Sequence, residues 1–325
     1  MLSPDTQVVM LLTAVLPDRT GDATPVGPAE FARLMRWLSG KQQTPSMLLS
    51  SEVRAQLQDE AAEHQLNVER LHKLLDRGMS VAVAAEKWLG MSLWIASVCD
   101  QEYPQRLKER LQDRSTPLLY GVGKSGLLSG GGIAVVGSRN ADAAALDFAK
   151  RIGELCAREG ITVISGGAKG VDLAAMHGAL EAGGSAIGVL ASQLARETTS
   201  SDARAYIADG KLALVSPYSP EAPFSAGNAM GRNKYIYAIA DYSIVVSSDA
   251  DSGGTWSGAI ENLAQKWCPL FVREAPDTPD GNRKLVRKGG IPLSSNHIET
   301  SQTFLDYLSL QMTSDNGPAQ TSLFS

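Results

Sequence analysis

The sequence of 325 residues contains few cysteines and no long apolar run. Its three cysteines, Cys99, Cys156 and Cys268, are far apart and form no CxxC pair, which argues against a zinc site or a disulfide framework. The apolar run 8–16 is too short for a membrane-spanning helix, which needs about 20 residues, and no basic residue of a secretory signal precedes it. We therefore expect a cytoplasmic protein with no membrane contact and no bound metal.

The chain also lacks an excess of positive charge. It has 30 Lys and Arg against 35 Asp and Glu, and its net charge is −5. Any phosphate site must therefore be local, made from a few cations and from backbone N–H groups. Neither GxGxxG nor GxxxxGK[ST] occurs in the sequence, which argues against a dinucleotide site and against ATP-driven work. We expect no cofactor.

Residues 1 to about 92 have a helical pattern. Phe31, Leu34, Met35 and Leu38 recur at i, i+3, i+4 and i+7, which is one face of a helix. Leu66, Leu71, Leu74 and Leu75, followed by Gly78, indicate another short helix.

From residue 132 onward, short apolar strands alternate with helices. The predicted strands are 133–137, 161–165, 186–190, 212–216, 243–247 and 269–272, and the predicted helices are 141–159, 171–182, 232–240 and 255–267. Residues 273–292 are expected to form a connection rich in Pro, Gly and Asp, and residues 300–312 a last helix. Buried strands alternating with helices predict a doubly wound α/β fold with a mostly parallel sheet. Ligands of such sheets bind at the carboxyl ends of the strands.

The first glycine turn at this edge is Gly137-Ser138-Arg139, between a strand and a helix. A glycine permits close approach of the backbone, a helix N-terminus attracts anions, and Arg139 can bind a phosphate in bidentate fashion. An ordinary connection between strand and helix would explain this turn equally well when it is taken alone.

The second turn holds three glycines within five positions, more than a tight turn needs. Its candidate phosphate-binding residues are Ser165, Gly166, Gly167 and Lys169. The backbone amides of such a loop can form a nest that faces an anion. Asp172 follows, either as a cap of the next helix or as a catalytic carboxylate.

Two further clusters complete the predicted edge. Arg232 and Lys234 are expected to open a helix, where their charges would add to its positive end. Ser252, Gly253, Gly254 and Thr255 form another turn between strand and helix, with Glu261 two turns into that helix. Four turns suited to anions on one edge predict a ligand rich in phosphate.

These motifs resemble the DNA-processing protein A family (DprA, also called Smf). The resemblance spans about Tyr103 to Val272 and rests on "YPQRL", "PLLYGVG", "IAVVGSR", "SGGAKGVDLAAMHGALEAGG", "GRNKYIYAIAD" and "SGGTWSGA" in this order. It implies an extended Rossmann-like domain that binds single-stranded DNA in DNA processing, recombination or defence. It also implies phosphate contacts from Ser138, Arg139, Ser165, Gly166, Lys169, Arg232 and Lys234. The expected domains are a helical N-terminal domain (1–115), the DprA-like domain (116–300), and a C-terminal helix with a flexible tail (301–325).

Two alternatives concern how the ligand is used. Tyr235 or Tyr237 could stack on the bases of a bound strand. The chain also resembles phosphoribohydrolases of the same superfamily, which implies a glycohydrolase acting on a nucleotide or ADP-ribose-type linkage. An N-glycosidase needs a carboxylate near the anomeric carbon, and Glu261 or Asp172 is the candidate.

The last six residues, "QTSLFS", suggest a partner. Gln320, Leu323 and Phe324 resemble the short motif by which bacterial DNA-processing proteins bind the replicative sliding clamp. An inert terminus, or a tail folded back on the domain, is the alternative. The sequence leaves open whether the chain forms a homodimer.

Overall fold

The computed structural model describes residues 2–17, 23–199, 201–294 and 303–314. The chain divides into two compact units: the first comprises Met1–Gly130 and Ile187–Ile239, and the second Gly131–Ala186 and Ala240–Ser325. In the described ranges, no helix combines the length and the apolar character needed to cross a membrane. The domain boundaries after residues 115 and 300 stay a prediction, because compact packing and independent folding are different properties.

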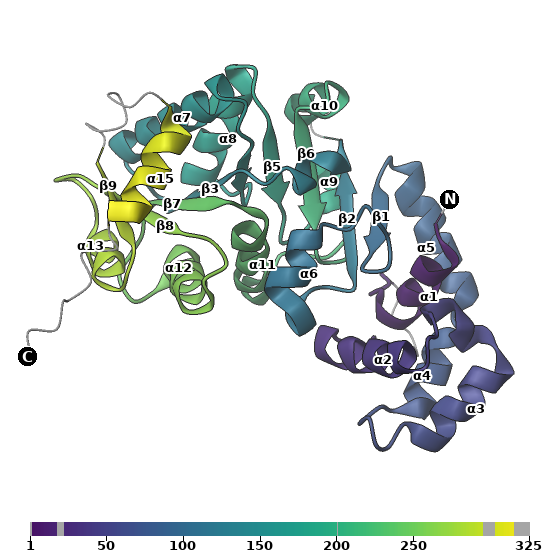
Figure 1. Cartoon of the computed structure of the whole chain (residues 1–325). Coiled ribbons are helices and arrows are strands. Elements are labelled where there is room, and N and C mark those ends of the chain that lie inside the picture. Colours follow the sequence, from purple (N-terminus) through teal and green to yellow (C-terminus); the bar gives the residue numbers. More distant parts are fainter. Residues whose placement is uncertain (1, 18–22, 200, 295–302, 315–325) are drawn as a thin grey trace, which may run out of the picture. The chain divides into compact units, whose positions relative to one another are not determined.

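The strands of the described residues form a nine-stranded sheet in the order β1-β2-β6-β5-β4-β3-β7-β8-β9 (Figure 1). β3 pairs in parallel with β4 and β7, β7 with β8, and β8 with β9, whereas β2 pairs antiparallel with β1 and β6. The predicted α/β fold with a mostly parallel sheet is confirmed. The strands are β1 (Trp94–Ser97), β2 (Leu118–Val122), β3 (Ile133–Gly137), β4 (Val163–Ser165), β5 (Ala186–Val189), β6 (Leu212–Ser216), β7 (Tyr242–Ser247), β8 (Leu270–Glu274) and β9 (Ile291–Ser294).

Helices precede the sheet and alternate with its strands. The α-helices are α1 (Pro4–Thr13), α2 (Pro28–Gly40), α3 (Ser51–Glu60), α4 (Val68–Leu75), α5 (Gly78–Gly90), α6 (Gln105–Leu111), α7 (Ala143–Arg158), α8 (Val171–Glu181), α9 (Leu194–Glu197), α10 (Ser201–Ala208), α11 (Ala226–Ile239), α12 (Gly253–Gln265), α13 (Asp280–Arg287) and α15 (Phe304–Ser314). Short 3₁₀ turns are η1 (Pro45–Leu49), η2 (Gln112–Arg114) and η3 (Ser125–Ser129).

The helical N-terminal region of the first unit has the predicted apolar faces. Phe31, Leu34 and Leu38 of α2 are buried, as are Leu71 and Leu74 of α4. The prediction of helices in this region is confirmed, because the spacing of apolar residues matches the turn of a helix.

The second unit is organised around the tight packing of α7 against α8. A Cβ added to Gly153 of α7 would lie 2.2 Å from the carbonyl oxygen of Ala175, and one added to Gly178 of α8 would lie 2.3 Å from that of Lys150. Only glycine permits so close an approach of two helix backbones. Since α7 and α8 each begin at one of the glycine turns, their packing fixes how these turns meet.

The helix containing Arg232 and Lys234 begins earlier than the sequence suggests. α11 starts at Ala226, where the Ser225 hydroxyl accepts a hydrogen bond from the Asn228 amide at 3.0 Å. The prediction that Arg232 and Lys234 open this helix is therefore wrong. Its first turns are rich in glycine and asparagine, which have low helix propensity and hid the true start.

The expected irregular connection at 273–292 contains a helix and a strand, α13 and β9. Asn282 explains why this polar stretch folds, because its side chain accepts from the Ser248 amide at 2.9 Å and donates to the carbonyls of Val246 and Arg273 at 3.0 and 2.9 Å. A Cβ on Gly281 would lie 2.1 Å from the Ser248 carbonyl oxygen, so glycine at this position permits a close contact between the two backbones.

Candidate nucleic-acid interface

The first glycine turn closes β3 beside the end of β7. Gly137 is paired with Ser247, and the Ser138 amide donates to the Ser247 carbonyl at 2.9 Å. A Cβ on Gly137 would lie 2.6 Å from Val171, so glycine is needed here for the approach of α8. Arg139 is exposed at the tip of the turn. The turn thus combines a structural glycine with a cation that faces solvent.

The second glycine loop is shaped by Asp172. This buried carboxylate accepts hydrogen bonds from the amides of Gly166 at 3.1 Å and Ala168 at 3.4 Å. Ser165 is fully buried, and its hydroxyl donates to the Val135 carbonyl at 2.5 Å. Two of the loop amides are therefore taken by Asp172, and a nest that binds an anion through this loop stays a prediction. Lys169 is exposed in the same loop.

The turn and the loop touch each other through their backbones. A Cβ on Gly170 would lie 2.4 Å from the carbonyl oxygen of Ser138 and 2.9 Å from Cα of Arg139. The Val171 amide also points at the Ser138 oxygen, at 3.4 Å. Gly170 has φ 93° and ψ −132°, a backbone conformation that is essentially restricted to glycine. The exposed cations Arg139 and Lys169 therefore start from adjoining segments.

The turn that follows β7 belongs to the same unit and opens α12. Ser252, Gly253 and Gly254 are exposed and Thr255 is half-buried, and the side chain of Ser252, the N-cap residue of α12, makes no capping hydrogen bond. Gly253 has φ 84° and open space around it. Because β7 pairs directly with β3, this turn leaves the sheet beside the first glycine turn. The second unit thus gathers three of the four predicted clusters on neighbouring strands.

The fourth predicted cluster belongs to the first unit. Arg232 is only 5% exposed, its Nη1 donates to the carbonyl of Val189, and its Nε donates to Asn233 at 3.3 Å. Lys234 Nζ donates to the Arg114 carbonyl at 2.8 Å and lies 5.2 Å from the centre of the Tyr235 ring. These contacts secure α11 within its unit, and phosphate contacts from Arg232 and Lys234 stay a prediction.

The tyrosines of α11 do not offer a stacking surface. Tyr235 is 3% and Tyr237 is 1% exposed, and burial raises the pKa of the Tyr235 hydroxyl well above its ordinary value. The hypothesis that they stack on bases is therefore wrong, because both rings are packed in the core.

The two carboxylates of the glycohydrolase alternative differ in their surroundings. Asp172 is occupied by the loop amides, which favours a role in shaping the loop. Glu261 is half-buried on α12. The tail residues Gln320, Leu323 and Phe324 lie outside the described residues.

The sequence did not predict that Gly170 contacts the backbone of Ser138 and Arg139, because the number of glycines in the loop does not show which segment each of them meets. A signal was available, because the glycine directly precedes the helix, at a position where the sequence offers no side-chain cap.

These features define a class: a doubly wound α/β protein with glycine turns gathered at the carboxyl ends of parallel strands, where such sheets bind ligands. The sequence model of the family described as DNA recombination-mediator protein A matches residues 94–297, and the chain belongs to this family.

Solved structures of two DNA processing A proteins illustrate the shared fold. DNA processing protein A from Streptococcus pneumoniae is 19% identical with a TM-score of 0.71, over 95% of this chain and 98% of that one. DNA processing protein A from Helicobacter pylori is 21% identical with a TM-score of 0.53, over 69% of this chain and 98% of that one. A search of curated proteins gave no match.

Proposed function

We propose that this chain binds single-stranded DNA at the contact between Gly137–Arg139 and Ser165–Gly170, and that it acts as a recombination mediator in DNA processing. Membership of the family supports this proposal, as does the Helicobacter pylori relative, which binds single-stranded DNA. The observation that carries it is the backbone contact of Gly170 with Ser138, beside which two exposed cations emerge.

The chemistry of such a site suits a phosphate backbone. Arg139 offers a planar fork of donors to a phosphate, and Lys169 offers a mobile point charge. The turn Ser252–Thr255 adds the positive end of α12, a helix of 13 residues. Because the chain has a net charge of −5, binding depends on these local groups and is sensitive to salt.

The test is the salt dependence of binding to a labelled oligodeoxythymidylate, followed by fluorescence anisotropy over a series of NaCl concentrations. Each phosphate contact on a single strand contributes a slope of about −0.7 to log K against log salt. Replacing Arg139 and Lys169 together by Gln should therefore flatten the slope by roughly 1.4 and weaken binding. Arg151→Gln, at an exposed position of α7, is the matched control and should leave the slope unchanged. A double variant with the parent's affinity and slope would refute the site.

The proposal extends to the cellular location, the oligomeric state and the biological setting. We place the protein in the cytoplasm, where its DNA substrate is found and where cysteines stay reduced, and Cys99, Cys156 and Cys268 are free thiols. Homodimerisation is proposed as well, and sedimentation velocity over a range of concentrations tests it. Whether recombination or defence is the setting is a question for deletion strains challenged with DNA damage and with phage.

We also propose that the tail binds the sliding clamp. Leu323 and Phe324 would fill an apolar pocket, and Gln320 would hydrogen-bond at its rim. A tail that becomes ordered on binding loses entropy, so the dissociation constant should be on the order of micromolar. Replacing Leu323 and Phe324 together by Ala should abolish clamp binding, measured by surface plasmon resonance, and leave DNA binding intact. Equal clamp binding by parent and variant would contradict this proposal.

A further inference from the structure

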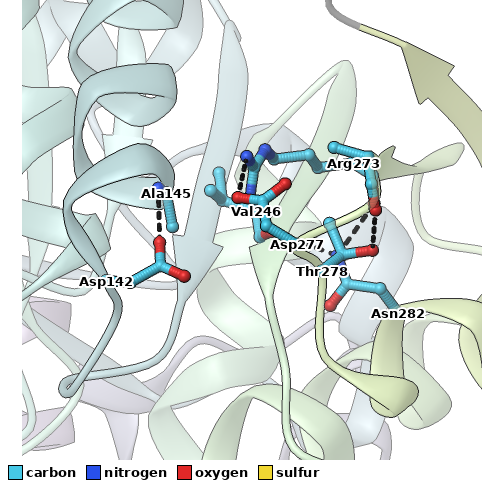
Figure 2. A network of polar contacts seen from close by, with 8 residues as sticks. Asp142, Ala145, Val246, Arg273, Asp277, Thr278 and Asn282 are labelled. Carbon is cyan, nitrogen blue, oxygen red and sulfur yellow. Dashed lines mark hydrogen bonds and ion pairs between the residues drawn. The ribbon is translucent and has the colours of Figure 1, made fainter.

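Arg273 is a buried cation near the carboxyl end of β8, in the second unit. It is 5% exposed, and its guanidinium lies 5.3 Å from the centre of the Phe148 ring of α7. Its Nη2 donates to Asp277 at 2.7 Å. Figure 2 shows the guanidinium extending from β8 toward the N-terminal part of α7, which is marked by Asp142 and Ala145.

Two of the three nitrogens of this guanidinium are unused. Nε and Nη1 of Arg273 are buried and have no hydrogen-bond partner among the described residues. A buried donor without an acceptor is costly, and more so when it carries charge. The polar side chains nearby already have other partners. Asn282 donates to the carbonyls of Val246 and Arg273, and the Thr278 hydroxyl donates to the carbonyl of Ala275.

The backbone that carries Arg273 is held firmly. Asn282 binds the carbonyl of Arg273 itself and that of Val246 on the neighbouring strand, and accepts from the Ser248 amide. These bonds join β7, β8 and α13 (Figure 2). The cation is therefore prearranged, which lowers the cost of ordering it for a ligand.

Asp277 occupies the one nitrogen that matters most for bidentate binding. A guanidinium has two forks of paired donors, one made by Nη1 with Nη2 and one by Nε with Nη2. Nη2 belongs to both. A single contact of Asp277 with Nη2 therefore blocks both forks without filling either of them. The side chain of Asp277 is 39% exposed, so it can turn away into solvent.

We propose that Arg273 is a subsite for a terminal phosphate group, and that Asp277 holds its place in the unliganded protein. Once Asp277 turns away, an oxyanion can take Nη2 together with Nε or Nη1 and satisfy the unused donors. We take the phosphate at the end of a strand, or a free phosphate, as the ligand, because a phosphodiester carries a nucleoside on both sides and is the bulkier group to bring to buried nitrogens.

The strand-end form of this inference rests on the proposed function and adds to it a preference for phosphorylated DNA ends. The first experiment measures the affinity of the full-length protein for oligodeoxythymidylates with a 5′-phosphate, a 3′-phosphate or hydroxyl ends, at one ionic strength. A terminal phosphate should tighten binding about tenfold, the effect of one charge-assisted hydrogen bond. Arg273→Gln should remove this preference. Arg283→Gln, at a solvent-exposed ion pair with Asp280 on α13, is the matched control and should keep it.

Asp277→Asn keeps the test decisive if the Arg273 variant fails to fold. Removing the competing carboxylate charge should increase the preference for phosphorylated ends several-fold, whereas a purely structural ion pair predicts a less stable protein with no such gain. If neither the parent nor Asp277→Asn distinguishes phosphorylated from hydroxyl ends, and inorganic phosphate does not raise the melting temperature of either, the subsite does not exist.

Inorganic phosphate separates this inference from the proposed function. If phosphate stabilises the parent, and stabilises Asp277→Asn more, while no oligonucleotide binds, the subsite stands as one for free phosphate and the DNA-binding proposal fails. The opposite outcome is that hydroxyl-ended strands bind and lose affinity when Arg139 is replaced, while neither a terminal phosphate nor inorganic phosphate has an effect. The DNA-binding proposal then stands and the subsite is refuted.

Discussion

The contact between the two glycine segments gives a sharp prediction, because Gly170→Ala disturbs it with a single methyl group. The added Cβ would lie 2.4 Å from the Ser138 oxygen, whereas ordinary contact begins at 3.4 Å. The oxygen must therefore retreat by about 1 Å, and with it the segment that carries Arg139. The backbone conformation of Gly170 adds a strain of about 1–3 kcal/mol for any residue with a Cβ.

The expected result is a loss of binding in addition to the loss of stability. A shift of this size breaks or lengthens at least one charge-assisted hydrogen bond to phosphate, worth about 1.5–3 kcal/mol. The affinity for single-stranded DNA should therefore fall by roughly 10- to 100-fold. Fluorescence anisotropy with a labelled oligodeoxythymidylate measures it, and urea denaturation of the same samples measures the free energy of unfolding.

Gly160→Ala is the matched control for this prediction. Gly160 follows α7 in the same unit and also has a positive φ, 68°, but a Cβ there meets nothing within 4 Å. The control should lose about 1 kcal/mol of stability and no affinity for DNA. If Gly170→Ala binds DNA as tightly as Gly160→Ala, the contact does not position the site, and the reasoning fails.

Two other predictions concern the first unit. Arg232→Ala removes the donor that binds the Val189 carbonyl, so it should lower the free energy of unfolding by about 1–3 kcal/mol, measured by urea denaturation. Arg204→Ala, at an exposed position of α10, is the control and should leave the free energy of unfolding unchanged. Burial raises the pKa of Asp100, but hydrogen bonds from Thr6 and from neighbouring groups outweigh it and leave the pKa below its ordinary value. The stability contributed by Asp100 is therefore present above the unfolded pKa of about 3.9 and is lost as the pH falls through the lower folded value. Asp100→Asn should destabilise the protein at neutral pH and converge with the parent at pH values below the lowered folded pKa of Asp100, and a constant difference at all pH values would contradict this.

The regular elements were predictable where the pattern was local. The strands at 133–137 and 212–216 match β3 and β6 to the residue, because each is an apolar run ended by a turn signal. The prediction failed where the apolar pattern is weak and polar side chains set the element. The start of α11 depends on a serine cap, and α13 depends on Asn282, a side chain whose partners come from β7 and β8.

In the candidate site, the positions of the turns could be predicted from the sequence, whereas the roles of their residues could not. The glycine turns could be found from spacing alone, and three of them lie on neighbouring strands. What each residue does there could not be found, because it depends on contacts between segments some 30 positions apart. Ser165 bonds with Val135, and Gly170 contacts Ser138. Arg273 is the extreme case: a lone arginine near the end of an apolar strand carries no signal until its burial and its unused nitrogens are known.

The glycines of the second unit are best understood together. Gly153 and Gly178 bring the backbones of α7 and α8 into contact. Gly137 leaves room for the side chain of Val171, and Gly170 leaves room for the carbonyl oxygen of Ser138. Each of them removes a side chain from an interface between the same two strand-to-helix segments. The result is one body in which the turn and the loop cannot move apart without separating the helices behind them. A site built in this way can leave its ligand contacts to exposed side chains such as Arg139 and Lys169, because the backbone beneath them is already ordered and binding need not order it again.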